Sequence, residues 1–240
     1  MSGFEDFPLV SGSRYKPVVL AHRGDHRIHK PNSLLAVTSS LSSGADGAEV
    51  DLRLGAEGGV FLSHDPVQKG YQLARAREED AELEKLAICT LDKVLASSPG
   101  EMLLNLELKR DPLERVEEFT ESVLSKCGPY VSSKRLLFSS FDRKLVESLK
   151  TKAPEAKVAL LLEYRTSVDR SISYAKELGL FGLNLHYRKA LGKSLERCLE
   201  AGLKVNVWTL DDEKSAIDLS YHPVTGIITN KIAEIRRVVG

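Results

Sequence analysis

Short β-rich runs alternate with amphipathic segments along almost the whole chain, and this alternation restricts the possible folds more than any other feature. The predicted strands lie at 18–21, 48–54, 102–109, 135–141, 157–162, 182–186, 204–210 and 226–229. Helices are expected between them, at 33–43, 90–98, 112–127, 142–152, 167–178, 191–201 and 211–219. Strands that alternate with helices pair in parallel through right-handed crossovers. Eight such units in 240 residues predict an α/β protein folded as a (β/α)8 TIM barrel.

The barrel is expected to be a single domain over residues 17–240, preceded by an N-terminal extension at 1–16. The run 60–63 is either a hairpin extension of the strand at 48–54 or the third strand, and a short insertion follows it. Within that insertion, residues 66–89 are charged and are expected to form a loop with a short helix. An open doubly wound sheet is the alternative fold. However, Gly24 stands alone after the first strand, where a nucleotide-binding sheet has a Gly-rich loop.

The charge balance and the cysteines exclude several classes of protein. Lys plus Arg and Asp plus Glu both total 34, so the chain lacks the strong positive field of a nucleic-acid binder. No apolar stretch approaches the roughly 20 residues that span a bilayer, and the N-terminus, with Glu5 and Asp6, does not resemble a secretory signal. A cytoplasmic protein is therefore expected. Cys89, Cys127 and Cys198 are too widely separated for a disulfide framework or a zinc site, and are expected to be buried.

Charged residues occupy one face of two predicted strands. In a barrel strand, side chains point alternately to the interior and to the helices outside. With that period, the inward side chains are Glu49, Asp51 and Arg53 in one strand and Asn105, Glu107 and Lys109 in the other. Buried carboxylates must be paired or bound to a cation. The alternative is a solvent-facing side of antiparallel strands, but the same pattern in two strands favours the barrel interior.

Glu49, Asp51 and Glu107 together predict an oxygen-rich site for a hard divalent cation, Mg²⁺ or Ca²⁺. Two histidines, His22 and His64, each end a predicted strand, and imidazole titrates near neutrality, so they suit an acid/base pair. Three cationic residues lie close to these positions in the sequence: Arg23, Arg53 and Lys109. Their positive charges favour an anionic ligand. A metal, cations and two histidines together suit the cleavage of a phosphoester.

These residues lie in short motifs whose order resembles the glycerophosphodiester phosphodiesterase family. The motifs are His22-Arg23-Gly24, Asn32-Ser33, Gly44 to Asp51, His64-Asp65, Asn105 to Lys109, Val207-Trp208-Thr209 and Gly226 to Thr229. The resemblance covers about residues 17–230 and implies a TIM barrel. It also implies a hydrolase of lipid or glycerol metabolism that converts glycerophosphodiesters to glycerol 3-phosphate and an alcohol. In such enzymes a glycerol hydroxyl attacks phosphorus, and water opens the resulting cyclic phosphate.

The resemblance also implies a role for each matching residue. One divalent cation, Mg²⁺ or Ca²⁺, would be the cofactor. The binding partner would be a small glycerophosphodiester substrate, and assembly into homo-oligomers is compatible with this assignment. The metal ligands would be Glu49, Asp51 and Glu107, the general acid and base His22 and His64, and the phosphate-binding residues Arg23 and Lys109. Trp208 is either packing at the barrel mouth or a wall that contacts the glycerol, and the resemblance favours the wall.

The chain departs from the family pattern at three places. The segment 30–33 lacks the glutamate that usually follows the first motif, the segment after His64 is abbreviated, and Asn230 replaces the usual aspartate. The loop with Asp25, His26 and His29 is interpreted as solvated rather than as a second metal site. Two other functions stay open. One is lysophospholipid cleavage in the manner of a phospholipase D, and the other is a barrel that binds a phosphodiester without cleaving it.

Overall fold

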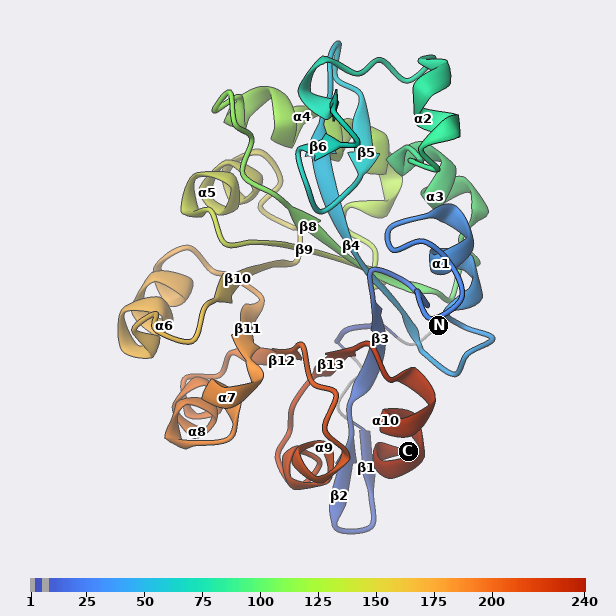
Figure 1. Cartoon of the computed structure of the whole chain (residues 1–240). Coiled ribbons are helices and arrows are strands. Elements are labelled where there is room, and N and C mark those ends of the chain that lie inside the picture. The colour runs from blue at the N-terminus through green and yellow to red at the C-terminus, as the bar shows by residue number, and fades with distance from the viewer. Residues whose placement is uncertain (1–2, 6–8) are drawn as a thin grey trace.

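The computed structural model, which describes residues 3–5 and 9–240 (backbone only at 9–11), contains a closed ring of parallel strands (Figure 1). The eight strands are β3 (Val18–His22), β4 (Gly47–Leu54), β8 (Leu103–Leu108), β9 (Leu136–Ser140), β10 (Val158–Leu162), β11 (Gly182–His186), β12 (Lys204–Trp208) and β13 (Gly226–Thr229). Each strand pairs in parallel with the next along the chain, and β13 pairs with β3, which closes the ring. The predicted (β/α)8 TIM barrel is confirmed.

Helices surround the ring of strands (Figure 1). They are α1 (Leu34–Ser39), α3 (Leu91–Ser97), α4 (Val116–Cys127), α5 (Arg143–Lys152), α6 (Val168–Glu177), α7 (Tyr187–Ala190), α8 (Lys193–Glu200), α9 (Glu213–Leu219) and α10 (Ile232–Val239). The helix predicted at 191–201 corresponds to α8, whereas the prediction omits both α7 and α10. That last helix packs through Ile232, Ile235 and Val239, which recur at helical spacing and are buried.

The segment between β4 and α3 forms the insertion. β5 (Val60–Leu62) pairs with β4 in antiparallel orientation, so the run 60–63 is a hairpin extension and not a barrel strand. The two-residue strands β6 (Val67–Gln68) and β7 (Tyr71–Gln72) follow, then a 3-10 helix at Leu73–Arg75 and α2 (Ala81–Lys85). The expected short helix is present, whereas the small hairpin was not predicted, because two-residue strands have no periodic pattern. A separate apolar cluster that includes Phe61, Leu73 and Leu83 holds the insertion together.

Part of the N-terminal extension packs against the barrel. Phe4 is fully buried in the inner core of the barrel, with Val18, Leu20 and Leu137. Strands β1 (Leu9–Ser11) and β2 (Arg14–Lys16) form a hairpin, and Lys16 Nζ donates to the Gly240 carbonyl oxygen at 2.8 Å. Residues 1–2 and 6–8 of the predicted extension lie outside the described residues. The division of the chain at residue 16 stays a prediction.

The two faces of the barrel strands differ as the alternation predicts. The apolar faces of β4 and β8 belong to the main core between strands and helices, and they consist of Ala48, Val50, Leu52 and Leu54 in β4 and Leu104, Leu106 and Leu108 in β8. The opposite face of the same strands is charged and buried, with Glu49, Asp51 and Glu107. All three cysteines are buried and free. The charged face therefore lies inside the barrel, where the site is built.

None of the helices described is both long and apolar enough to cross a membrane. The expected cytoplasmic location stays a prediction, as does the assembly of the chain into homo-oligomers.

Candidate active site

The register of β3, β4 and β8 aligns four of the predicted site residues. His22 of β3 is the pairing partner of Glu49 in β4, and Asp51 of β4 is the partner of Glu107 in β8. These strands are parallel, so their carboxyl ends meet at one mouth of the barrel, the end at which barrel enzymes place their active sites. The structure thus brings the four side chains to one place.

Glu49, Asp51 and Glu107 form a buried acidic cluster. Each offers a carboxylate oxygen atom, and these atoms all lie within 4.8 Å of one another. Glu49 Oε1 is buried and has no hydrogen-bond partner in the described part of the chain. Burial, together with the charges of Asp51 and Glu107, raises the pKa of Glu49 well above its ordinary value. Burial also raises the pKa of Glu107 to about 7. A cluster of carboxylate oxygen atoms fits a hard divalent cation such as Mg²⁺ or Ca²⁺, which would relieve this repulsion.

Lys109 and Arg23 bring positive charge to the acidic cluster. Lys109 Nζ lies 2.9 Å from Asp51 Oδ1 and 2.5 Å from Glu107 Oε1. Arg23 Nε lies 3.1 Å from Asp51 Oδ2, and the Arg23 backbone N–H donates to Glu49 Oε2 at 3.1 Å. Although burial opposes ionisation of Asp51, Lys109 and Arg23 hold the pKa of this carboxyl below its ordinary value. Two cations against three carboxylates leave a site that can accept further positive charge.

The loop after β3 uses left-handed backbone to reach this cluster. Arg23 has φ 58° and Asn32 has φ 60°. Between them, Gly24 has φ 78°, and a Cβ atom there would lie 2.4 Å from the Ala36 backbone, so the turn requires glycine. Asn32 Nδ2 donates to Asp51 Oδ2 at 2.8 Å, while Asn32 Oδ1 accepts from the Asp51 backbone N–H at 3.0 Å. Asn32 therefore orients a carboxylate of the cluster, a role that its place in the motif alone does not reveal.

His22 lies half-buried between the acidic cluster and an amide. Its Nε2 atom is 3.9 Å from Glu49 Oε2, and its Nδ1 atom is 2.8 Å from Asn230 Oδ1. His26 Nε2 also lies 2.8 Å from Asn230 Oδ1. Burial lowers the pKa of His22 to about 4, even though the hydrogen bond to Asn230 acts in the opposite direction. The His22 ring is therefore neutral near pH 7 in the metal-free protein.

The interpretation of the loop after Gly24 as solvated is wrong for Asp25. The Asp25 side chain is buried, and it accepts from Arg27 Nε at 2.9 Å and Arg27 Nη2 at 3.0 Å and from the Ser43 hydroxyl. These bonds fasten the loop to the turn that follows α1. Sequence position could not show this, because Ser43 lies 18 residues away.

His64 lies at the rim of the site, on the loop after β5. Two bonds hold its backbone beside β4. The Ser63 N–H donates to the Asp51 carbonyl oxygen at 2.9 Å, and Arg53 Nε donates to the His64 carbonyl oxygen at 3.1 Å. The ring is half-exposed, and its Nδ1 atom lies 2.8 Å from Asp65 Oδ1. Among the described residues the ring has no bond to the acidic cluster, so the structure brings the His64 backbone beside β4 but leaves its ring half-exposed.

Trp208 ends β12 and lies in a row of rings that we name the aromatic wall: Phe141, Trp208 and His186. The Phe141 and His186 ring centroids each lie 5.3 Å from that of Trp208, in edge-on geometry. Trp208 Nε1 donates to the Asn184 carbonyl oxygen at 3.0 Å. Lys109 Nζ lies 5.9 Å from the Phe141 centroid, which links the wall to the acidic cluster.

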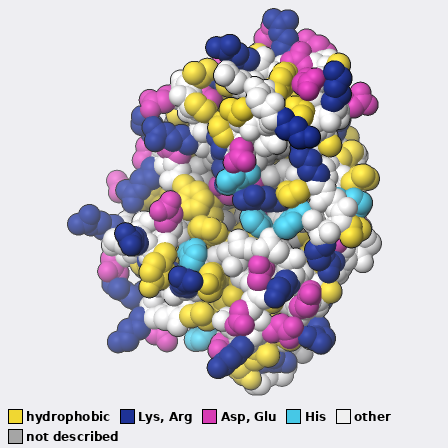
Figure 2. All heavy atoms as spheres, viewed as in Figure 1, with side chains coloured by type: hydrophobic (Ala, Val, Ile, Leu, Met, Phe, Trp, Pro, Cys, Tyr) yellow, Lys and Arg dark blue, Asp and Glu magenta, His cyan; other side chains and the backbone are white. Residues whose placement is uncertain are grey.

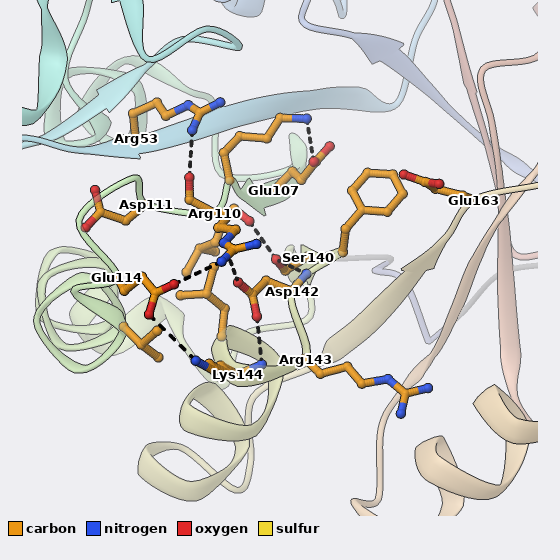
Figure 3. Close-up of a pocket in the computed structure, with 15 residues that line it drawn as sticks. Arg53, Glu107, Arg110, Asp111, Glu114, Ser140, Asp142, Arg143, Lys144 and Glu163 are labelled. Atoms are coloured by element: carbon orange, nitrogen blue, oxygen red, sulfur yellow. Dashed lines mark hydrogen bonds and ion pairs between the residues drawn. The ribbon is translucent and has the colours of Figure 1, made fainter. Parts of the chain in front are cut away.

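A cavity of about 550 Å³ adjoins the acidic cluster and has Glu107 and Lys109 in its lining (Figure 3). Its opposite wall is a chain of charged side chains from the β8–α4 and β9–α5 loops. Arg110 Nη2 lies 3.0 Å from Glu114 Oε1 and Arg110 Nε 3.9 Å from Asp142 Oδ2. On the face shown in Figure 2, histidine, acidic and basic side chains gather near the centre, next to a hydrophobic patch. The site is thus open to solvent and has room for a group larger than a phosphate.

Three residues of the site were not assigned a role from sequence. The sequence pattern places Asn32 in a motif, His26 in a loop and Asp211 at the start of a predicted helix, and none of these positions by itself predicts a role in the site. Asp211 accepts hydrogen bonds from Asn230, which in turn contacts both His22 and His26. The departure at Asn230 was the one sequence signal that pointed to this group.

Comparison with known families agrees with the geometry. The model of the glycerophosphoryl diester phosphodiesterase family matches residues 22–234. A glycerophosphodiester phosphodiesterase of Caldanaerobacter subterraneus subsp. tengcongensis is 27% identical over 232 residues, covering 90% of this chain and 94% of the relative. A glycerophosphodiester phosphodiesterase of Bacillus altitudinis is 25% identical over 232 residues, covering 88% and 94%.

Solved structures show the same fold. A glycerophosphodiester phosphodiesterase of Parabacteroides distasonis superposes with a TM-score of 0.82 at 25% identity, covering 95% of this chain and 98% of that one. A phosphodiesterase of Oleispira antarctica, solved with sn-glycerol-3-phosphate, has a TM-score of 0.80 at 22% identity, covering 93% and 97%. Since the family match spans nearly the whole chain, the protein belongs to the glycerophosphoryl diester phosphodiesterase family and is a phosphodiesterase.

Proposed function

We propose that this phosphodiesterase hydrolyses glycerophosphodiesters to glycerol 3-phosphate and an alcohol, with a divalent cation in the acidic cluster and His22 and His64 as its proton-transferring groups. The single observation that carries the proposal is the acidic cluster itself. Three buried carboxylates offer oxygen atoms within 4.8 Å of one another, and in the described part of the chain Arg23 and Lys109 are the cations paired with them. The Oleispira antarctica enzyme, solved with sn-glycerol-3-phosphate as product, supports the choice of substrate.

Glu49, Asp51 and Glu107 would hold the cation, Mg²⁺ or Ca²⁺. When bound, such an ion stabilises negative charge on a phosphate and lowers the pKa of a hydroxyl group. In the structure the Lys109 ammonium group forms ion pairs with the carboxylate oxygen atoms of Asp51 and Glu107. A bound metal cation would compete with Lys109 for these atoms. The Lys109 ammonium group would then be available to a phosphate oxygen, as would the guanidinium group of Arg23.

His22 and His64 would divide the proton transfers. His22 Nε2 is on the side of the acidic cluster, 3.9 Å from Glu49 Oε2, whereas the His64 ring is half-exposed to solvent. One ring would take the proton of the attacking hydroxyl group, and the other would give a proton to the departing alcohol. A pair of positioned imidazoles typically accelerates such steps by about 10²–10⁴-fold each.

The two remaining surfaces of the mouth suit the two ends of the substrate. The aromatic wall presents apolar ring surface beside Lys109, which suits the carbon skeleton of glycerol. The charged cavity beyond Lys109, with Glu163 at its edge, is polar and open (Figure 3). It has the room for the departing alcohol and its head group.

The test is the release of glycerol 3-phosphate from glycerophosphocholine and glycerophosphoethanolamine, with Mg²⁺, with Ca²⁺ and with EDTA. We expect turnover that requires the metal and is lost in His64→Ala. His222→Ala is the matched control and should leave turnover unchanged, because in the described part of the chain His222 has no bond to the site residues. Turnover of lysophospholipids alone would replace the proposal with phospholipase D-type cleavage. Binding of the diesters without any cleavage would favour a binding barrel.

A further inference from the structure

We propose that Asp211 and Asn230 are positioning residues that keep a proton on His22 Nδ1, so that Nε2 is the atom through which His22 exchanges protons with the substrate. This inference rests on the proposed catalytic role of His22. It adds two residues from the far end of the chain, and a second histidine, His26, that shares the same oxygen atom.

The carboxylate of Asp211 fixes the orientation of the Asn230 amide. Asp211 Oδ2 accepts from Asn230 Nδ2 at 2.6 Å, and Asp211 Oδ1 accepts from the Asn230 backbone N–H at 2.8 Å. The Thr229 hydroxyl donates to the same Oδ1 atom at 2.9 Å, which holds the carboxylate in place. A carboxylate can only accept from an amide NH₂ group, so the flipped amide would set two oxygen atoms against each other. The Asn230 carbonyl oxygen must therefore face the histidines.

The Asn230 carbonyl oxygen in turn fixes the two rings. It lies 2.8 Å from His22 Nδ1 and 2.8 Å from His26 Nε2. An amide oxygen has no hydrogen to donate and two lone pairs to share, so both ring nitrogen atoms must carry their hydrogen. The two rings meet edge-on, with centroids 6.2 Å apart, so each can reach the oxygen without overlapping the other.

The outcome is a defined tautomer of His22. With the hydrogen on Nδ1, the neutral ring presents an unprotonated Nε2 on the side of the acidic cluster, near Glu49 Oε2. The hydrogen bond of one ring nitrogen commonly decides which state the other ring nitrogen takes at a site. Asn230 supplies that bond without adding a negative charge beside His22. The carboxylate of Asp211 instead accepts hydrogen bonds from the Asn230 amide and backbone.

The test is the ¹⁵N NMR spectrum of protein labelled at histidine, which separates a protonated from an unprotonated ring nitrogen. His22→Gln identifies the His22 signals among the six histidines. We expect Nδ1 protonated and Nε2 unprotonated in the metal-free wild type at neutral pH. In Asn230→Leu, of similar size but without an acceptor, we expect a mixture of tautomers. An unprotonated Nδ1 in the wild type, or an unchanged tautomer in Asn230→Leu, would overturn the proposal.

The exchanged pair Asp211→Asn/Asn230→Asp is the rescue, because an amide at 211 can donate to a carboxylate at 230 and leave an acceptor for both rings. We expect it to restore the Nδ1–H signal of His22 that Asn230→Leu loses. The signals of His186 and His222, which do not contact Asn230, report whether each variant is folded. If Asn230→Leu does not fold, the wild-type and exchanged-pair spectra still decide the matter.

Kinetics add a second readout on a glycerophosphodiester. We expect Asn230→Leu to lower kcat about 100-fold with KM within about threefold, since substrate contacts are retained while a proton transfer is impaired. A change confined to KM would contradict a role through His22. Failure of the proposed function is separable, because wild-type protein that cleaves no diester contradicts the function, whereas the NMR result stands or falls without any substrate.

Discussion

The barrel interior has two halves that follow the same alternation of residues and differ in charge. The charged half consists of Glu49 and Asp51 on β4, Glu107 on β8 and Lys109 directly after β8. The amide half, defined by Asn184, Asn206 and Trp208 on β11 and β12, carries no charge. There Asn206 Nδ2 donates to Asn184 Oδ1 at 2.9 Å, and Trp208 Nε1 donates to the Asn184 carbonyl oxygen.

This difference in charge suggests that one half of the interior serves the reaction and the other serves the stability of the fold. In the charged half, burial and mutual repulsion raise the pKa values of Glu49 and Glu107, so the carboxylates disfavour their ionised state in the folded protein. In the amide half, the Asn206 amide donates to the Asn184 amide across adjacent strands, and the two buried amide atoms left without a partner among the described residues, Asn184 Nδ2 and Asn206 Oδ1, carry no charge. Buried charges that oppose folding are retained where a reaction requires them. Hence the charged half is expected to control activity and the amide half to control stability.

The largest expected effect is that of Glu49→Gln, which keeps the shape of the side chain and removes its charge. We expect activity to fall about 10³-fold, while the free energy of unfolding stays equal or rises by about 1 kcal/mol, because a buried repulsion is removed. Rates of glycerol 3-phosphate release and urea unfolding curves measure the two quantities. Glu121→Gln, an exposed site on α4, is the control. Full activity in Glu49→Gln would remove Glu49 from the set of metal ligands.

Adding the metal should act on the charged half alone. At about 100 times its Kd, Mg²⁺ or Ca²⁺ would stabilise the folded state by about 2.7 kcal/mol, which corresponds to about 5–10 °C in Tm for a chain of this length. Calorimetry with and without EDTA measures the shift. We expect a smaller shift in Glu107→Gln and the full shift in Asn206→Ala. An equal shift in both variants would erase the distinction between the halves.

A substitution in the amide half should show the reverse pattern. Asn206→Ala leaves Asn184 Oδ1 without its buried donor, so we expect a loss of about 1–3 kcal/mol in the free energy of unfolding. The Tm shift produced by the metal should persist, since no ligand is touched. Trp208→Phe, which removes the donor to the Asn184 carbonyl oxygen and part of the ring that packs against Phe141 and His186, should also leave this metal shift in place. Unfolding midpoints unchanged in Asn206→Ala would show that this half does not carry stability.

The smallest effect concerns pH in the absence of metal. The folded pKa of Glu107, about 7, lies above its ordinary value of 4.5, so the folded state binds this proton more tightly and loses that stabilisation as the pH rises through 7. His22, with its lowered pKa, acts oppositely below pH 6.5, which leaves pH 6.5 to 8 as the informative window. There we expect the free energy of unfolding to fall by about 1 kcal/mol in EDTA.

Glu107→Gln is the comparison for this pH effect, because it removes the titrating group. Its free energy of unfolding should vary less between pH 6.5 and 8 than that of the wild type. If the free energy of unfolding varied with pH in the same way in both proteins, a group other than Glu107 would be the one that titrates.

Much of the fold and the acidic cluster could be predicted because both depend on local pattern. Alternation along 48–54 and 102–109 separated the apolar from the charged face, and the structure has the same separation. The small hairpin of β6 and β7 could not be predicted, because two-residue strands form only when the chain around them is folded. The burial of Asp25 was missed for a similar reason, since Ser43 lies in another turn.

The sequence by itself determined the barrel, the face on which the charges lie and the acidic composition of the candidate metal site, because each follows from residue types at fixed short spacing. Only the tertiary structure decided how His22 is oriented. Asn230, its partner, is 208 residues away, and the two meet because β13 pairs with β3 and closes the barrel. A contact across that seam has no counterpart in local pattern. The alternation that places charges inside the barrel is local, whereas the hydrogen bond between His22 and Asn230 depends on closure of the ring of strands.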